Sequence, residues 1–424
     1  MAASGGIRAQ CLSVSDIGVA NNSTNALLVL NSQDVLIGGS FTTIDGVAAS
    51  RIARRAGSTW SPLGAGFSAG SVNSITQAAN GSIYAAGQFA SSGATIVNNI
   101  AVWNGVSWQA LGSGLTAAQI QVPPAVDDLV VLTGGDLIVA GRFSESAGPP
   151  FVTLPHLARW NGSSWSTVAG GGIRYANGSL PEPNVLLSMP DGGFIVAGAF
   201  NRAGPSPGFV ANNIARWSAG IWSALGSGLE DASFGEVRAL LLMPNGDVIA
   251  GGDIDLAGGS PVGNIARWDG SLWHPLGAGT DGTIVDLALL PSGALLATGS
   301  FTTAGGQPAP GRATWDGNLW KPYLPQLTDS IVRSSVLLNG SIVHAGTLTG
   351  TFNTSIKIAT KVSIQAGDAN SDLVVDFSDV TSILSNFGAS YAPGSNGPGD
   401  SDGDGVVQFA DLSFTLANFG ASCI

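Results

Sequence analysis

Short runs of alternating apolar and polar residues fill the chain up to about residue 365, and they recur with a long period. The second copy shows the pattern most clearly, with runs at Val72–Ala79, Ser82–Phe89, Ile100–Trp103 and Trp108–Gly112. Asn-Gly separates the first two runs and Asn-Gly-Val-Ser the last two. Because Asn-Gly between alternating runs is a strong hairpin signal, each copy is predicted to form four short antiparallel strands.

Two markers define the copies. A Gly-x-apolar triplet ends the second strand of each copy, at intervals of 47 to 57 residues; its apolar members are Phe41, Phe89, Phe143, Phe200, Ile254, Phe301 and Leu348. Tryptophans five residues apart form the second marker, at Trp103/Trp108, Trp160/Trp165, Trp217/Trp222, Trp268/Trp273 and Trp315/Trp320. Four strands in a repeat of about 50 residues predict a β-propeller blade.

The fixed positions of the tryptophans favour packing within the repeat, and a sugar-stacking platform is the alternative. Four arginines also recur at one position and indicate repeat architecture; they are Arg54, Arg159, Arg216 and Arg267.

The seventh copy has only three strands, and an unassigned strand-like run, IRAQCLSVS, stands near the start of the chain. We expect residues near Ile7–Ser15 to pair with residues near Ser355–Ile364 and so to close a ring of seven blades, which leaves no open sheet edge. The expected fold class is mainly β, with a small α-helical module at the C-terminus. In period and hairpin pattern, residues 8–365 resemble kelch-like propellers, including the central domain of galactose oxidase. That resemblance implies a fold and says little about activity.

The tail has a different pattern. Between Asp400 and Asp411 the sequence DSDGDGVVQFAD places oxygen ligands at positions 1, 3, 5, 7, 9 and 12 of a twelve-residue loop, with Gly405 at position 6. This spacing is typical of an EF-hand calcium loop, whose oxygens neutralise a hard cation. The predicted ligands are Asp400, Asp402, Asp404, Val406 through its carbonyl, Gln408 and Asp411.

A second loop, DANSDLVVDFSD, precedes it by 32 residues. Its predicted ligands are Asp368, Asn370, Asp372, Val374 through its carbonyl, Asp376 and Asp379. Leu373 stands at position 6, where the turn favours glycine, so we expect the first of two Ca²⁺ sites to be the weaker. A short amphipathic segment follows each loop, and Gly388 and Gly420 are placed to end these helices. An acidic, glycine-rich linker is the alternative.

Residues 366–424 therefore resemble a type I dockerin, a duplicated calcium loop with one helix per loop. The resemblance implies a cohesin-like partner on a scaffold or cell surface, and a protein involved in polysaccharide processing. The positions that commonly carry Ser-Thr in that family are Phe377-Ser378 and Phe409-Ala410 here, which puts the cohesin partner in question. The expected domains are residues 1–365 for the propeller and 366–424 for the dockerin-like module.

The composition limits the classes of partner and the cellular locations that fit this chain. The net charge is −12, of which the tail carries −8 (eight aspartates and no Lys, Arg or Glu) and the preceding chain −4. No basic patch for nucleic acid and no apolar run long enough to cross a membrane is present. Only Cys11 and Cys423 occur, which excludes a disulfide-dense scaffold. The calcium loops favour an extracellular or cell-surface location, with a signal segment expected upstream of Met1.

The propeller carries no recognisable catalytic motif. Its longest loops are Ser144–His156, Ile173–Asn184 and Asn201–Asn213, all expected on one face, and long loops on a rigid scaffold are common binding sites. Their candidate residues for binding a glycan or protein ligand are Phe151, His156, Arg174, Tyr175, Arg202 and Phe209. Drift in loop length without function is the alternative.

The sequence thus favours a non-catalytic binding or display protein that is tethered through its tail. The first alternative is a polysaccharide-active hydrolase or lyase with carboxylates from different blades. The second is a tail that only caps the propeller.

Overall fold

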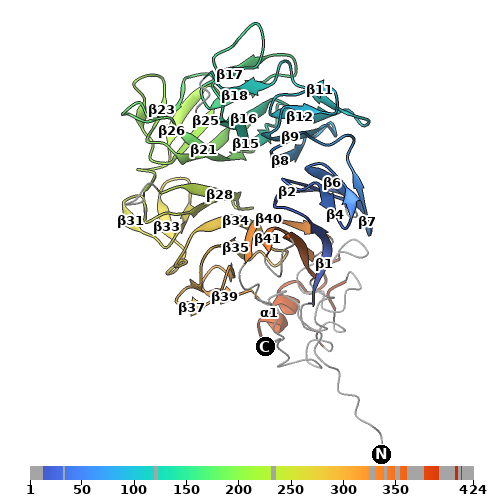
Figure 1. Cartoon of the computed structure of the whole chain (residues 1–424). Coiled ribbons are helices and arrows are strands. Elements are labelled where there is room, and N and C mark those ends of the chain that lie inside the picture. Colours follow the sequence, from blue (N-terminus) through green and yellow to red (C-terminus); the bar gives the residue numbers. More distant parts are fainter. Residues whose placement is uncertain are drawn as a thin grey trace, which may run out of the picture.

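The computed structural model describes residues 13–31, 34–118, 123–230, 235–323, 330–338, 341–348, 354–360, 377–390, 406–408 and 412. Up to residue 360 these residues form short antiparallel strands and turns, because the sequence alternates apolar and polar residues between Gly, Asn and Asp turns. The strands form sheets arranged around a centre (Figure 1). The fold is mainly β and propeller-like.

Six sheets have four strands each and are numbered here in chain order. Sheet 1 contains β2 (Thr24–Asn31), β3 (Asp34–Gly39), β6 (Ile52–Ala56) and β7 (Thr59–Pro62). Sheet 2 contains β8 (Ser71–Gln77), β9 (Ile83–Gln88), β12 (Ile100–Trp103) and β13 (Trp108–Ala110). Sheet 3 contains β15 (Ala125–Val131), β16 (Leu137–Arg142), β18 (Leu157–Trp160) and β19 (Trp165–Ser166).

Sheet 4 contains β21 (Glu182–Ser188), β22 (Phe194–Ala199), β25 (Ile214–Ser218) and β26 (Ile221–Ala224). Sheet 5 contains β28 (Val237–Leu242), β29 (Val248–Gly252), β32 (Ile265–Trp268) and β33 (Trp273–Pro275). Sheet 6 contains β34 (Ile284–Leu289), β35 (Leu295–Gly299), β38 (Arg312–Trp315) and β39 (Trp320–Pro322). The strands of sheet 2 lie within two residues of those predicted from the alternation.

A further sheet, called here the closing sheet, joins the two ends of this region. It contains β40 (Ser330–Leu338), β41 (Ser341–Leu348), β42 (Thr354–Thr360), β1 (Ser13–Ala20), β4 (Thr43–Ile44) and β5 (Val47–Ala48). β1 is antiparallel to β42, with Ser13 opposite Thr360 and Ala20 opposite Thr354. The expected partner residues 7–12 lie outside the described part of the chain.

The first strands of the sheets form the inner ring. β2, β8, β15, β21, β28, β34 and β40 each contact the next, and β40 contacts β2. The hydrophobic core lies between neighbouring sheets: Leu36 and Ile52 of sheet 1 pack with Val72 and Trp108 of sheet 2 in one cluster. Because each sheet buries both faces against its neighbours, no sheet has a core of its own.

Small two- and three-stranded sheets lie at one end of the larger sheets. They are β10 (Ser91–Ser92) with β11 (Thr95–Ile96), β14 (Leu115–Thr116) with β17 (Glu145–Ser146), β20 (Gly172–Arg174) with β23 (Arg202–Gly204) and β24 (Phe209–Val210), β27 (Leu229–Glu230) with β30 (Leu256–Ala257) and β31 (Ser260–Pro261), and β36 (Thr303–Ala304) with β37 (Gln307–Pro308). The pairs β14–β17, β20–β23 and β27–β30 each join the loop that enters a sheet to the loop between its second and third strands. These two kinds of loop therefore share a face, as expected.

The tail is described in part. α1 (Phe377–Ser385) is followed by Gly388 at φ 86°, which fits a helix stop. Ile383 is buried against Val407, whereas Leu384 is 61% exposed and Phe387 47%. Within the amphipathic segment predicted after the first loop, Ile383 is thus buried, whereas Leu384 and Phe387 are largely exposed. In the described part of the chain, no helix has the length and apolar character that crossing a bilayer requires.

Candidate functional site in the central channel

Every inner strand carries a β-bulge at the same repeat position. The ladder between the first and second strands skips one residue there, and a bulged residue is unpaired and turned out of the ladder. The bulged residues are Asn25, Asn73, Asp127, Asn184, Arg238, Val285 and Arg333. All seven line one cavity of about 600 Å³ at the centre of the ring, so the bulges define a central channel.

The glycine of each Gly-x-apolar triplet makes room for the bulge. A Cβ at Gly87 would lie 2.0 Å from the carbonyl oxygen of Ser71, and one at Gly299 would lie 2.1 Å from that of Thr283. Such a distance is far inside van der Waals contact, so only glycine fits opposite the bulge. The triplet that marks the repeat in the sequence therefore also shapes the channel.

The asparagines of the ring tie neighbouring sheets together. The Nδ2 atom of Asn25 donates to the carbonyl oxygen of Val72 (3.4 Å) and that of Asn73 to the carbonyl oxygen of Val126 (3.2 Å). Asn184 Nδ2 donates to Glu236 Oε1 (2.5 Å) and to the carbonyl oxygen of Val237 (3.5 Å). Each contact runs from one inner strand to the next, which gives these amides a structural role.

Two of the three channel arginines are ion-paired. Arg142 Nε lies 3.5 Å from Asp127 Oδ2, and Arg238 pairs with Glu236. Arg333 has no acidic partner among the described residues. Its exposed guanidinium is therefore a cation in the channel that remains open to a ligand.

Two aspartates occupy equivalent positions, one residue after the bulge. Asp128 accepts hydrogen bonds from Ser74 Oγ (2.7 Å) and from the backbone N–H groups of Leu129 and Leu186 (both 2.8 Å), so it joins sheets 2, 3 and 4. Burial nevertheless raises its pKa to about 6. Burial also raises the pKa of Asp286, to about 7, and its Oδ2 atom is shielded from solvent without a hydrogen-bond partner. Asp286 therefore keeps one carboxyl oxygen without a hydrogen bond, whereas both oxygens of Asp128 accept one.

The six loop residues predicted from the sequence lie in different structural environments. Arg174 and Arg202 face each other in the β20–β23 pair, and Phe209 lies on the adjoining β24. Arg174 Nη2 donates to the carbonyl oxygen of Gly204 (2.6 Å) and Arg202 Nη1 to that of Gly208 (3.1 Å), while Phe209 packs against the core. The structure thus brings these three together, with contacts that hold the small sheet.

The remaining three loop residues lie outside the strands of that sheet. His156 is buried at φ 63°, with Nδ1 3.2 Å from the carbonyl oxygen of Gly141. Asn99 and Asn213 occupy the equivalent left-handed position in sheets 2 and 4. His156 therefore has a structural role that belongs to the repeat. Phe151 is 65% exposed. Burial raises the pKa of Tyr175, and the charges of Glu182 and Glu236 raise it further, which places this phenol within electrostatic reach of two carboxylates.

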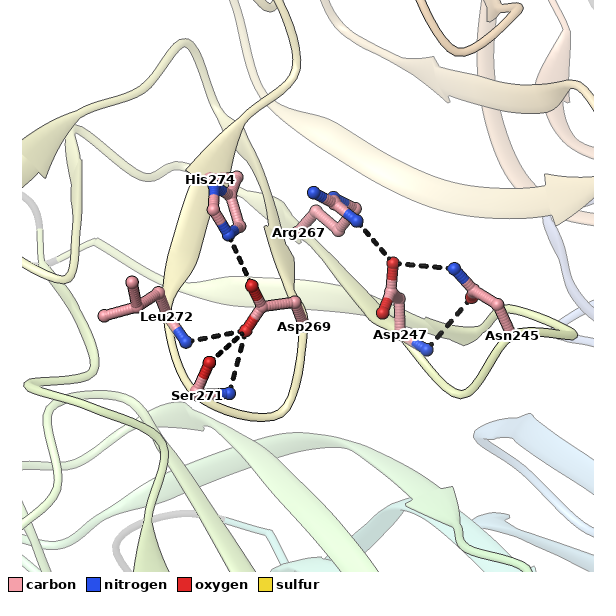
Figure 2. A network of polar contacts seen from close by, with 7 residues as sticks. All are labelled: Asn245, Asp247, Arg267, Asp269, Ser271, Leu272 and His274. Carbon is pink, nitrogen blue, oxygen red and sulfur yellow. Dashed lines mark hydrogen bonds and ion pairs between the residues drawn. The ribbon is translucent and has the colours of Figure 1, made fainter.

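The recurring arginines are structural, as the sequence indicates. Arg54 pairs with Asp34, Arg159 with Asp136, Arg216 with Asp191 and Arg267 with Asp247. Figure 2 shows the last of these beside the hairpin tip where Asp269 accepts from Ser271 and Leu272 and lies 2.6 Å from His274 Nε2. These contacts stabilise turns and strand ends, so this network is not a candidate site.

Most predicted calcium ligands lie outside the described residues. Of these ligands, only Val406 and Gln408 are described with their side chains. For Asp379 the structure describes the backbone, which is helical. Within the ranges that the structure describes, no three metal-ligating side chains gather. Val407, at position 8 of the second loop, donates its N–H to the carbonyl oxygen of Ala389 (2.9 Å), and its own carbonyl accepts from Gly388 N–H (2.8 Å). Val375, which stands at the same position of the first loop, is not among the described residues.

Comparisons with known proteins found similar solved structures at low identity. No family model and no curated protein matches the chain. Solved structures similar to it include YCF48 bound to a D1 peptide (12% identity, 82% of this chain and 95% of that chain, TM-score 0.49). The WD40 β-propeller domain of Doa1 has 13% identity (82% and 98% covered, TM-score 0.49). A catalytically inactive virginiamycin B lyase from Staphylococcus aureus with quinupristin has 10% sequence identity, with 82% of this chain and 98% of that chain covered and a TM-score of 0.49. At these identities the likeness extends to the propeller fold alone.

Proposed function

We propose that this protein is a seven-bladed propeller that binds a ligand in its central channel without transforming it, and that it is displayed through its C-terminal module. The ring of bulged residues carries the proposal. Each of the seven inner strands contributes its bulged residue to a single cavity, and six of these seven side chains are polar. A cavity lined by converging polar groups on a rigid scaffold suits specific binding.

The tail would supply the attachment. We infer two Ca²⁺ sites in residues 366–424, a dockerin-like module around them, and a cohesin-like partner on an extracellular scaffold or cell surface. Support comes from the loop spacing and from the contact of Ile383 with Val407, which joins the first helix to the second loop. A role in polysaccharide processing rests on the dockerin resemblance.

A screen of the full chain tests the binding role. We expect at least one ligand on a glycan or peptide array, with no release of reducing ends from polysaccharides that bind. Val285→Trp places a large ring in the channel and should abolish binding, whereas the double substitution Phe151→Ala and Tyr175→Ala tests the loop face. If the loop variant loses binding and the channel variant keeps it, the site lies on the loops and the channel proposal is wrong.

A polysaccharide-active enzyme is the second candidate. One observation favours it: Asp128 and Asp286 come from different sheets, line one cavity and both have raised pKa values, as a general acid requires. Reducing ends released by the wild-type chain and lost in Asp286→Asn would replace the binding role with this one.

A further inference from the structure

The boundary between sheet 6 and the closing sheet departs from the repeat. In each of the six four-stranded sheets, the cross-strand pair two residues after the bulge is apolar; the pairs are Leu27/Ile37, Ile75/Ala85, Leu129/Val139, Leu186/Val196, Leu240/Ala250 and Leu287/Ala297. In the closing sheet this pair is Ser335 and His344. Ser335 Oγ lies 3.0 Å from His344 Nδ1, and the histidine is fully buried.

Two residues of sheet 6 join this polar pair. Arg312 stands where the other sheets have Ile52, Ile100, Leu157, Ile214 and Ile265. Tyr323 follows the last tryptophan by three residues, where the others have Leu63, Leu111, Val168, Leu225 and Leu276. The Arg312 guanidinium lies 5.4 Å from the centre of the Tyr323 ring, and Tyr323 meets His344 edge-on at 6.4 Å. Four apolar positions have thus become polar at one boundary.

The polar cluster leads to the channel. Ser335 contacts the Asp286 carboxyl, and hydrogen bonds from Ser335 and Leu287 offset only part of the rise in its pKa that burial causes. Arg333 precedes Ser335 by two residues and lines the same cavity as Asp286. A buried polar cluster costs stability relative to the apolar packing of the other boundaries, which points to a role outside the fold.

We propose that Asp286 and Arg333 bind a carboxylate group of the channel ligand, and that Ser335 and His344 position Asp286 for this contact. The inference rests on the channel being the ligand site. Arg333 offers charge-assisted hydrogen bonds, and a protonated Asp286 donates a further one to a carboxylate oxygen. Because the acids near Arg142 and Arg238 already neutralise those arginines, the attraction for an anion is concentrated at Arg333.

The chemistry makes binding depend on pH. With a pKa of about 7, Asp286 is largely protonated at pH 6 and largely ionised at pH 8, where it would repel the ligand carboxylate. The other charged groups that line the cavity are Asp127, Asp128, Arg142, Arg238 and Arg333, and in the adjoining polar cluster the charge of Arg312 acts on His344. Affinity should therefore fall as the pH rises from 6 to 8.

Calorimetric titration of the full chain tests this with two matched probe pairs. One is trigalacturonic acid and its methyl ester; the other is an N-acetylated tripeptide with a free carboxylate and its amide. We expect one acid to bind at least tenfold more tightly than its neutral counterpart, and to bind more weakly at pH 8 than at pH 6. The pair that responds identifies the source of the carboxylate.

Variants separate the roles. Arg333→Gln should weaken binding at least tenfold, whereas Arg267→Gln, which removes a paired arginine outside the channel, should not. Asp286→Asn keeps a neutral donor and should abolish the pH dependence. Ser335→Leu with His344→Ala restores a pair found in sheet 6, so it should fold, yet it should weaken binding and alter the pH profile.

Equal binding of acid and neutral probes, or no binding of either acid, would overturn the carboxylate site, as would an unchanged pH profile in Asp286→Asn. The channel role has a separate test. A neutral ligand that Val285→Trp excludes and Arg333→Gln does not affect would leave the channel as the binding site and remove only the carboxylate inference.

Discussion

The indole Nε1 of Trp273 donates a hydrogen bond of 2.7 Å to the backbone carbonyl oxygen of Leu225, which belongs to the preceding repeat. Equivalent bonds start from Trp60, Trp108, Trp165 and Trp320. In sheet 4 the bond comes instead from the first tryptophan, Trp217, to the carbonyl oxygen of Ala169, and Trp222 Nε1 is buried without a partner. Phe194, which stacks on Trp217 at 5.4 Å, accompanies this exchange.

This difference gives a matched pair of variants. Trp273→Phe and Trp222→Phe remove similar volumes from similarly buried sites, but only the first removes a hydrogen bond between sheets. We expect Trp273→Phe to lower the free energy of unfolding by about 1 kcal/mol more than Trp222→Phe. Urea denaturation of both variants measures the difference, and equal losses would show that these bonds contribute nothing.

The triplet glycines should tolerate no side chain. Gly87→Ala would place a Cβ 2.0 Å from the Ser71 carbonyl oxygen and should cost about 3 kcal/mol or more, because the bulge at Asn73 has to move. Gly134→Ala is the control, since a Cβ there has no neighbour within 4 Å and the backbone is not left-handed. Thermal unfolding measures both, and a stable Gly87→Ala variant would mean that the bulge does not depend on glycine.

Stability should fall as the pH rises from about 4 to about 7. Asp128 and Asp286 have folded pKa values of about 6 and 7 against an ordinary aspartate value of 3.8, so the folded chain holds protons that the unfolded chain has released. Below pH 4 the opposite trend begins, because hydrogen bonds lower the pKa of Asp281 to about 2. Melting curves at fixed calcium concentration should therefore peak near pH 4 to 5. Asp286→Asn should flatten the upper slope, and an unchanged slope would contradict the assignment.

The two calcium loops should differ in strength. Asp400→Ala should reduce Ca²⁺ affinity and tail stability more than Asp368→Ala, since Gly405 suits position 6 and Leu373 does not. Calcium titration of the full chain by calorimetry measures the two sites, with circular dichroism in chelator and in millimolar Ca²⁺ as the structural readout. Identical spectra in both conditions would favour the acidic-linker alternative.

The sequence predicted the repeat well because its signals are local. Asn-Gly turns, alternation and the tryptophan pairs fall within four or five residues of each other, and the strands of sheet 2 follow them closely. The recurrence of Arg54, Arg159, Arg216 and Arg267 indicated a structural role, and each of these arginines is ion-paired in the structure. The conserved spacing between copies carried enough information for the architecture of each sheet.

The channel was missed because its residues do not share a motif. Asn25, Asp127 and Val285 differ in chemistry and become neighbours only when the ring closes. A usable signal did exist: the bulge stands opposite the triplet glycine, so aligning the first strands on that glycine would have brought the seven positions into one column. The same alignment would have revealed Ser335 and His344 as departures from an apolar pair.

The pairing of β1 with β42 also determines when the first strand can fold during synthesis of the chain. Ser13 can pair only after Thr360 has been synthesised, 347 residues later. At roughly 5 to 20 residues per second, the first strand would remain without its partner for about 17 to 70 seconds of synthesis. Its ladder groups and the face of sheet 1 that later packs on β40 are exposed to other chains throughout that interval. Sheets 2 to 6 can stack as they emerge, so the last step of folding is also the one most open to domain exchange between molecules made side by side.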